Sequence, residues 1–254
     1  MANKKNLLLR AVALIFVLFE SVMFYLIHIE RLDTELNLHY ACIIAAAIFS
    51  WLTLIIELVT AKANEKSAKD ILLSKTNGNM IRIAMLFTLL ADYFLVALPV
   101  AKHTEGVVVF LGTQLFIFLH ILFNEKDKKF RIANIVSRIL LMLIITIVAL
   151  IILGESVNAL AIISVIYYAN LCVNAVFAHR SGRGGILLTV GLILFGLCDI
   201  NVGLSALNDM YVGGFPEGSL LYNILNTEAD LIWIFYIPSQ TLIPLTLLYT
   251  NKTK

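Results

Sequence analysis

The stretch ILLMLIITIVALIIL, residues 139–153, contains no charged side chain, and Thr146 is its only polar residue. It lacks the alternation of polar and apolar residues that a barrel strand shows. Crossing the ~30 Å hydrocarbon core of a bilayer takes about 20 helical residues. The stretch and the residues just before it therefore predict a transmembrane helix, and the absence of strongly polar side chains predicts that lipid surrounds most of this helix.

The composition of the whole chain extends this prediction. Sixty per cent of the residues are apolar, only 14% are charged, and the mean hydropathy is +0.91, which together exclude an ordinary soluble domain. We predict an all-α fold, a polytopic membrane protein of about eight helices folded as one membrane-embedded domain over residues 1–254. The expected spans are residues 7–27, 39–60, 80–98, 106–123, 134–153, 157–178, 185–207 and 229–250.

Positive charges divide the connections between these spans into two sets. All but two of the 19 Lys and Arg residues lie at the termini or in one set of connections, the exceptions being Arg31 and Lys102. Arg138 is counted here with the connection before the fifth span. Because cytoplasmic loops carry the excess of Lys and Arg, the bias predicts cytoplasmic termini and an even number of spans. The expected location is the cell (cytoplasmic) membrane.

Three acidic residues interrupt otherwise apolar spans. Glu20 lies in the first span, Asp92 in LLADYFLVAL (89–98) and Asp199 in FGLCDINVGL (195–204), and each falls in the outer half of its span. A charged side chain at mid-membrane costs ~2.5–3.5 kcal/mol. A hydrogen bond between spans returns only ~0.6 kcal/mol on average. Asp92 and Asp199 are therefore candidates for function, and Glu20 a weaker one; if their helices are neighbours, the three acids form one layer.

Other polar side chains are expected to line the same interior. They are Gln114 in the fourth span, Tyr167, Asn170 and Asn174 in the sixth, and Gln240 in the eighth.

The glycines and prolines near these residues predict local packing. Gly196, Asp199 and Gly203 share one helix face, which predicts the close approach of another helix beside the acid. Prolines on both sides of Gln240 each free a backbone carbonyl one turn earlier and predict a kink.

Other chemistries have little support in the sequence. The histidines lack metal-ligand spacing, so no metal and no cofactor are expected. No Gly-x-Ser-x-Gly elbow or P-loop occurs, and no histidine lies near mid-depth of a span to serve as the base for a serine or cysteine nucleophile. The basic connections act as topology signals and contacts to anionic headgroups, so nucleic-acid binding is not expected.

Three blocks occur in a characteristic order. They are MLFTLLADYFLVALP (85–99) with VVVFLGTQLFIFLHILF (107–123), VIYYANLCVNAVFA (165–178) with VGLILFGLCDINVGL (190–204), and FYIPSQTLIPL (235–245). Together with the eight-span layout, they resemble the YhhN family of integral-membrane lysoplasmalogenases over residues 80–250. Ala91 stands where that family usually has Gly, Cys198 where it often has Ser, and Gln114 where His is expected.

The resemblance implies hydrolysis of the vinyl ether bond of a lysoplasmalogen, giving a fatty aldehyde and glycerophospho-ethanolamine or -choline. A vinyl ether is cleaved by protonation of its β-carbon, which gives an oxocarbenium ion that water captures. Two buried, adjacent carboxyls suit this chemistry, because one can donate the proton while the other stays charged. The implied catalytic pair is Asp92 and Asp199, either of which could be the acid.

The partners that the resemblance implies are a lysophospholipid substrate, water and membrane lipids. The residues expected to contact the substrate are Gln240, Tyr236, Asn170, Gln114, Tyr167 and Glu20.

Two other functions stay open at this point. In a proton-coupled transporter the same acids would bind and release protons. Transporters are often built from internal repeats, and the similarity between Leu90-Ala91-Asp92 and Leu197-Cys198-Asp199, the echo of one segment in the other, is a faint repeat of this kind. The echo covers few residues, and the first two spans have no later counterpart. A lipid sensor or assembly factor would instead bind lipid without forming a product.

Overall fold

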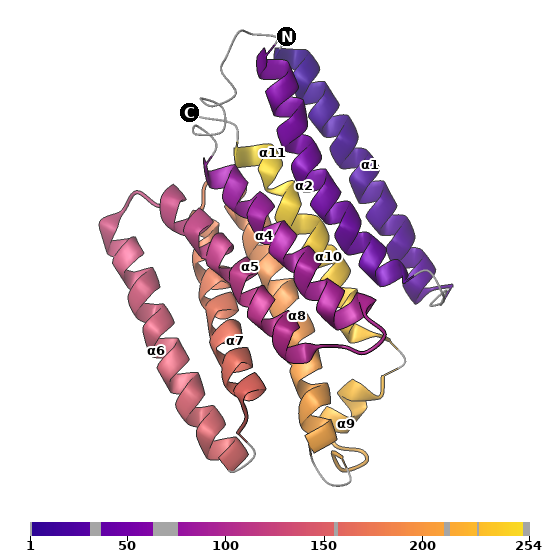
Figure 1. Cartoon of the computed structure of the whole chain (residues 1–254), viewed down its shortest axis with the longest axis vertical. Coiled ribbons are helices and arrows are strands. Elements are labelled where there is room, and N and C mark those ends of the chain that lie inside the picture. Colours follow the sequence, from indigo (N-terminus) through magenta and orange to yellow (C-terminus); the bar gives the residue numbers. More distant parts are fainter. Residues whose placement is uncertain are drawn as a thin grey trace.

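The computed structural model describes residues 2–30, 37–62, 76–154, 157–210, 214–227 and 229–250. Every regular element in these ranges is a helix (Figure 1). Eight helices in the described residues are long and apolar enough to cross a membrane, which confirms the all-α, polytopic prediction.

The eight spans are built on the main helices of the chain. Their bounds are α1 (Ala2–His28), α2 (Leu38–Lys62), α4 (Thr76–Asp92), α5 (His103–Asn124), α6 (Lys128–Leu153), α7 (Ala159–Phe177), α8 (Gly185–Met210) and α10 (Leu231–Leu245). The short helices α9 (Leu220–Leu225) and α11 (Leu247–Thr250) flank α10, a π-helical turn (Tyr93–Ala97) follows α4, and a 3-10 turn (Ala178–Arg180) follows α7.

The helix ends lie close to the predicted ones, and α6 shows the largest difference. The hydropathy pattern predicts a start at residue 134, whereas α6 begins at Lys128. The reason is a cap: the Asp127 side chain accepts a hydrogen bond from the Lys129 backbone N–H at 2.9 Å, which satisfies a free donor of the first turn.

Two tightly packed helix pairs, α4 with α5 and α8 with α10, occupy the middle of the bundle. A Cβ added to Gly112 would lie 2.2 Å from Cδ1 of Phe87, so only glycine lets α5 approach α4 this closely. A Cβ added to Gly191 would lie 2.9 Å from Cγ1 of Ile243, between α8 and α10. Because lipid is as apolar as the side chains, such close van der Waals packing is what holds spans together.

The outermost helices lie at opposite edges of the bundle, α1 beside α2 and α6 beside α7 (Figure 1). Leu143, Ile144 and Ile147 on α6 are each more than half exposed, at 56%, 57% and 55%. The protein leaves the apolar surface of this span uncovered, and contact of that surface with lipid stays a prediction.

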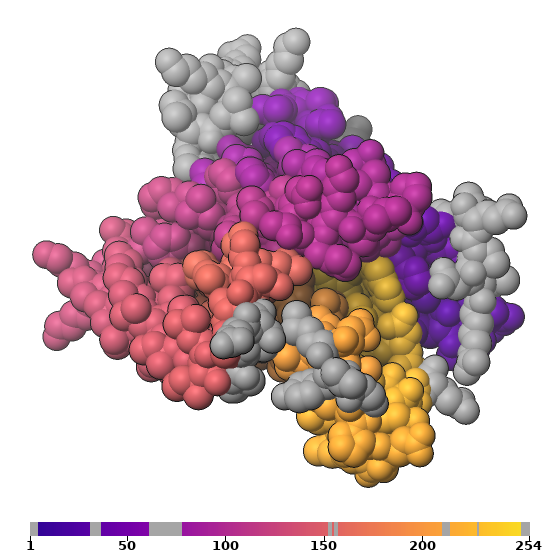
Figure 2. Space-filling model, turned by 60° about the horizontal axis from the view of Figure 1, so that its bottom comes forward, coloured from indigo at the N-terminus to yellow at the C-terminus, as the bar shows by residue number. Residues whose placement is uncertain are grey.

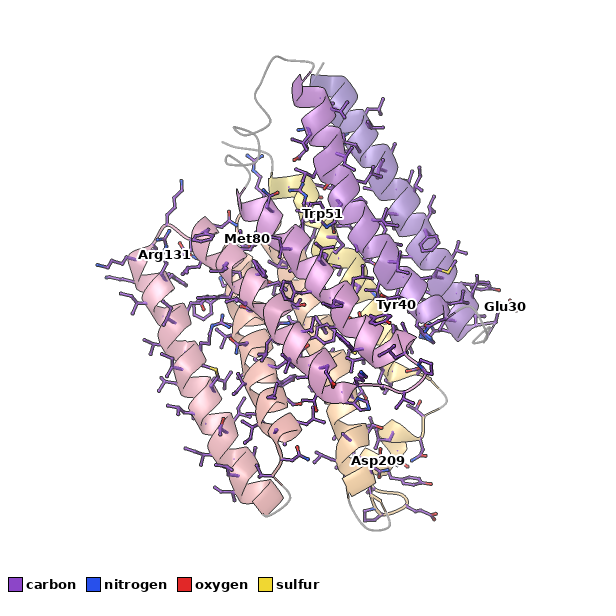
Figure 3. All side chains as sticks on the ribbon, in the orientation of Figure 1. Glu30, Tyr40, Trp51, Met80, Arg131 and Asp209 are labelled. Atoms are coloured by element: carbon purple, nitrogen blue, oxygen red, sulfur yellow. The ribbon has the colours of Figure 1, made fainter. Side chains whose placement is uncertain are left out.

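The two ends of the bundle differ in their charged residues. The first residues of α1 and α6 and the last residues of α11 lie at the same end of the bundle (Figure 1). Arg131 lies at this end, which we call the basic end, while Glu30 and Asp209 lie toward the other (Figure 3). Several of the basic residues used for the topology prediction lie outside the described residues, namely Arg31, Lys66, Lys69, Lys75, Lys252 and Lys254.

Two arginines assigned to connections are instead buried within helices. Arg82 on α4 is 1% exposed and lies 3.5 Å from Glu57 on α2, which is equally buried. Arg138 lies within α6 and is 8% exposed. The excess of positive charge at the basic end therefore does not depend on these two side chains.

Candidate functional site

Asp92 is the last residue of α4, immediately before the π-helical turn, a kind of turn frequent at functional sites. The side chain is 2% exposed. Its Oδ2 accepts a hydrogen bond from the hydroxyl of Tyr236 on α10 at 2.6 Å. The carboxyl is thus fixed between two helices that are far apart in the sequence.

Asp199 on α8 has the same kind of partner. The hydroxyl of Tyr167 on α7 donates to Oδ2 of Asp199 at 2.7 Å. Asp199 is partly exposed, in contrast to Asp92. Each acid of the predicted pair is therefore bound by one phenol.

The two carboxyl–phenol pairs belong to one site. The carboxyl groups of Asp92 and Asp199 are close enough to interact electrostatically. The ring of Phe195 lies between the two phenols, with its centroid 5.3 Å from that of Tyr236 and 6.5 Å from that of Tyr167. Four helices, α4, α7, α8 and α10, therefore bring the two acids together in the interior.

The helix face that carries Asp199 borders open space. Among the described residues, a Cβ added to Gly196 would meet its nearest neighbours, on Leu171 and Tyr168, only at 4.0 Å, and one added to Gly203 would meet nothing within 4 Å. The predicted close helix approach at these two glycines is wrong, because the close contact to α10 occurs nearer the start of α8, at Gly191. Figure 2 shows a recess at the end of the bundle opposite the basic end, bordered by α5, α7 and α8.

Unpaired polar groups lie one helix turn from Tyr236 on α10. Gln240 is 1% exposed, and within the described residues neither its Oε1 nor its Nε2 has a hydrogen-bond partner; the same holds for Oγ of Ser239. Pro244 has no N–H to donate to the carbonyl of Gln240. Buried polar groups are normally hydrogen-bonded to protein or ordered water. This part of α10 therefore has buried polar groups suited to bind water, one helix turn from the tyrosine that holds Asp92.

A family model, described as the YhhN family, matches residues 48–247. The chain belongs to the YhhN family. The matched range contains both aspartates and both tyrosines of the site, but not α1 with Glu20. Searches among curated proteins and among solved structures found no match.

In this YhhN protein, two of the predicted substrate-contacting residues belong to a separate polar cluster. Nη2 of Arg138 donates to Oδ1 of Asn174 at 2.8 Å, and Nδ2 of Asn174 donates to Oε1 of Gln114 at 2.9 Å. Asn170 accepts from Nη1 of Arg138 through its side-chain oxygen. Asn170 and Gln114 are thus engaged with the buried arginine, which the sequence assigned to a connection because it lies near the start of its span.

Glu20 lies apart from the aspartate pair of the YhhN protein. Helix α1 packs on α2 and α10, and Glu20 lies beside Cys42 of α2. Within the described residues its two carboxyl oxygens accept no hydrogen bond from an N–H or O–H group. The expectation of one layer of three acids therefore reduces to a pair of aspartates and a separate glutamate.

The described residues contain no group of three or more His, Cys, Asp or Glu side chains placed to hold a metal ion.

Proposed function

We propose that this protein is an intramembrane lipid hydrolase that cleaves the vinyl ether bond of lysoplasmalogens. The observation that carries the proposal is the meeting of Asp92 and Asp199 among membrane-spanning helices, each held by a tyrosine hydroxyl. Membership of the YhhN family fits a hydrolase. Since the scissile bond belongs to a lipid, an acid buried among the spans can reach it without the lipid leaving the membrane.

In the proposed first step, one carboxyl donates its proton to the β-carbon of the vinyl ether. The electron pair of the double bond forms the new C–H bond, and the positive charge is shared between the α-carbon and the ether oxygen. The second carboxyl, ionised, stabilises this oxocarbenium ion, as the paired carboxylates of glycoside hydrolases do. The rings of Phe195 and Phe110, which both contact Tyr167, are the kind of aromatic neighbours that also favour a cation.

In the second step water adds to the α-carbon and gives up a proton to a carboxylate, which leaves a hemiacetal. The hemiacetal then breaks its bond to the glycerol oxygen, and this oxygen takes a proton. The products are the fatty aldehyde and glycerophospho-ethanolamine or -choline, with one water consumed and no net change in protons. The unpaired amide of Gln240, one turn from Tyr236, supports a role for this side chain in holding that water.

The test is aldehyde release from a lysoplasmenyl lipid by the purified protein in detergent. We expect Asp92→Asn and Asp199→Asn each to lower kcat by about 10²–10⁴-fold, the usual contribution of a positioned proton donor or acceptor. In D₂O the aldehyde, trapped by reduction, should carry one deuterium on the carbon next to the carbonyl, since that carbon receives the proton. Asp209→Asn, on the exposed last turn of α8, is the matched control.

Full activity in either aspartate variant would contradict the paired-acid mechanism. A folded wild-type protein that releases no aldehyde would contradict the hydrolase itself, and proton-coupled transport would then be tested with the same variants.

A further inference from the structure

Arg138 is a buried positive charge within a membrane span. The residue lies ten positions after the start of α6 at Lys128, or ~15 Å along the helix axis. Its side chain is enclosed between α6, α7 and α5, with its guanidinium carbon 4.3 Å from the centre of the Phe118 ring. Placing a charge at such depth costs ~2.5–3.5 kcal/mol, so arginines inside spans normally have a partner or a task.

The protein groups around Arg138 satisfy hydrogen bonds but not charge. Its four terminal N–H groups are taken by amide oxygens, which are neutral; these acceptors belong to Asn134, Asn170 and Asn174. The other buried arginine, Arg82, has a carboxylate at 3.5 Å, that of Glu57. Among the described residues no carboxylate lies within ion-pair distance of Arg138.

Two donors of the same cluster are left over. Nε of Arg138 and Nε2 of Gln114 are buried, and within the described part of the chain neither has an acceptor. An unpaired buried donor costs ~1–3 kcal/mol. A cation with spare N–H groups beside it is the arrangement that binds an oxyanion, and the planar guanidinium favours phosphate in particular.

The position of the polar cluster relative to the aspartates indicates which phosphate group could bind to Arg138. Helix α7 carries a contact residue for each group. Asn170 binds Arg138, and Tyr167, about one turn earlier on the same helix, binds Asp199. One helix turn advances ~5.4 Å, comparable to the length of the three-carbon glycerol unit that separates the vinyl ether of a lysoplasmalogen from its phosphate. We propose that Arg138, with the amide of Gln114, binds the phosphate of the lysophospholipid while the vinyl ether lies at the aspartates, an inference that rests on the proposed function.

The site fixes the direction of the bound lipid. Arg138 lies closer to the basic end than the aspartates do, because Asn170 follows Tyr167 toward the end of α7 that adjoins this end. A lipid bound with its phosphate at Arg138 and its vinyl ether at the aspartates would therefore have its headgroup toward the basic end.

The experiment compares two substrates, a lysoplasmenylethanolamine and the matching 1-alkenylglycerol, which lacks the phosphate. Wild type should show the higher kcat/KM for the phosphate-bearing lipid. Arg138→Gln should lower the ratio of the two kcat/KM values by about 10–100-fold, the usual effect of losing hydrogen bonds to a charged group. Arg138→Lys keeps the charge but not the planar, two-pronged guanidinium, and it should restore part of the ratio. Arg10→Gln, at an exposed position on α1, should leave the ratio unchanged.

A structural role for Arg138 predicts a different pattern. If Arg138→Gln lowered kcat/KM equally for both lipids, the arginine would only stabilise the packing of the helices, and the proposal would be wrong. Inorganic phosphate is the second arm: inhibition of wild type by free phosphate as strongly as by a phosphate-bearing lysolipid would overturn the assignment to a lipid headgroup.

A binding measurement separates this proposal from the hydrolase. The probe is a 1-O-alkyl-lysophosphoethanolamine, which has no vinyl ether, compared with the 1-O-alkylglycerol by the rise in Tm that each causes. Tighter binding of the phosphate-bearing probe, lost in Arg138→Gln, would support the phosphate site even if no aldehyde formed. Aldehyde release without any phosphate preference would leave the hydrolase standing and refute the phosphate site.

Discussion

Each carboxyl of the candidate site is tied to a phenol through a single oxygen. Tyr236 holds Asp92 and Tyr167 holds Asp199, and within the described residues the second oxygen of each carboxyl, Oδ1, has no hydrogen bond. The tyrosines therefore fix the rotamers of the two acids and engage only one oxygen of each. Under the proposed function, the tyrosines would act as positioning residues and the aspartates would act on the lipid.

This arrangement predicts the effect of removing one hydroxyl. Tyr236→Phe and Tyr167→Phe should each lower kcat by about 10–100-fold with little change in KM. Each variant loses a hydrogen bond to a carboxyl group, worth about 1.5–3 kcal/mol, and this bond orients the carboxyl for reaction without binding the lipid. The measurement is steady-state aldehyde release, with Tyr249→Phe, 40% exposed on α11, as the control. A rise in KM at unchanged kcat would show instead that the phenols bind the lipid.

The elements differ in how far their positions follow from the sequence. Hydropathy predicts all eight spans because the need for apolar side chains in lipid is a local property of each segment. It contains no information about neighbours, so the pairing of Tyr167 with Asp199, and of Asn170 with Arg138, depends on how α6, α7 and α8 pack. The aspartates were identifiable because an acid in a span is costly. Arg138 was assigned to a connection because it lies near residue 134, where hydropathy predicts that its span begins.

One contact between elements can be tested through its dependence on pH. At the basic end Glu125, after α5, accepts a hydrogen bond from Nε of Arg180, after α7, at 2.8 Å. The Arg180 guanidinium holds the pKa of the Glu125 carboxyl below its usual value. A lowered pKa means that this contribution to stability is present above the pKa of the unfolded chain and is lost as pH falls through the folded value.

We therefore expect Glu125→Gln to lower Tm at pH 7 and the difference from wild type to shrink as pH falls below ~4.3, the ordinary value for Glu. Thermal unfolding in detergent across this range is the measurement. Glu105→Gln, exposed in the first turn of α5, serves as the control. A difference that stayed constant down to the most acidic pH would mean that the Glu125 side chain acts through packing and not through its charge.

For the whole molecule, the orientation in the membrane decides which side the phosphate faces. Helix α1 begins and α11 ends at the basic end (Figure 1), and the excess of Lys and Arg predicts that this end is cytoplasmic. Since Arg138 lies nearer to it than the aspartates do, a bound lysolipid would have its headgroup toward the cytoplasm, the orientation it has in the inner leaflet.

Single cysteines test this orientation in intact cells. Lys102→Cys, exposed between the π-helical turn and α5, should react with a membrane-impermeant maleimide, whereas Arg183→Cys, exposed between α7 and α8, should react only after the membrane is permeabilised. The native thiols are part of the control, because Cys42 and Cys198 are buried and wild type should remain largely unlabelled. The reverse pattern would place the basic end outside, and the headgroup of the bound lipid would then belong to the outer leaflet.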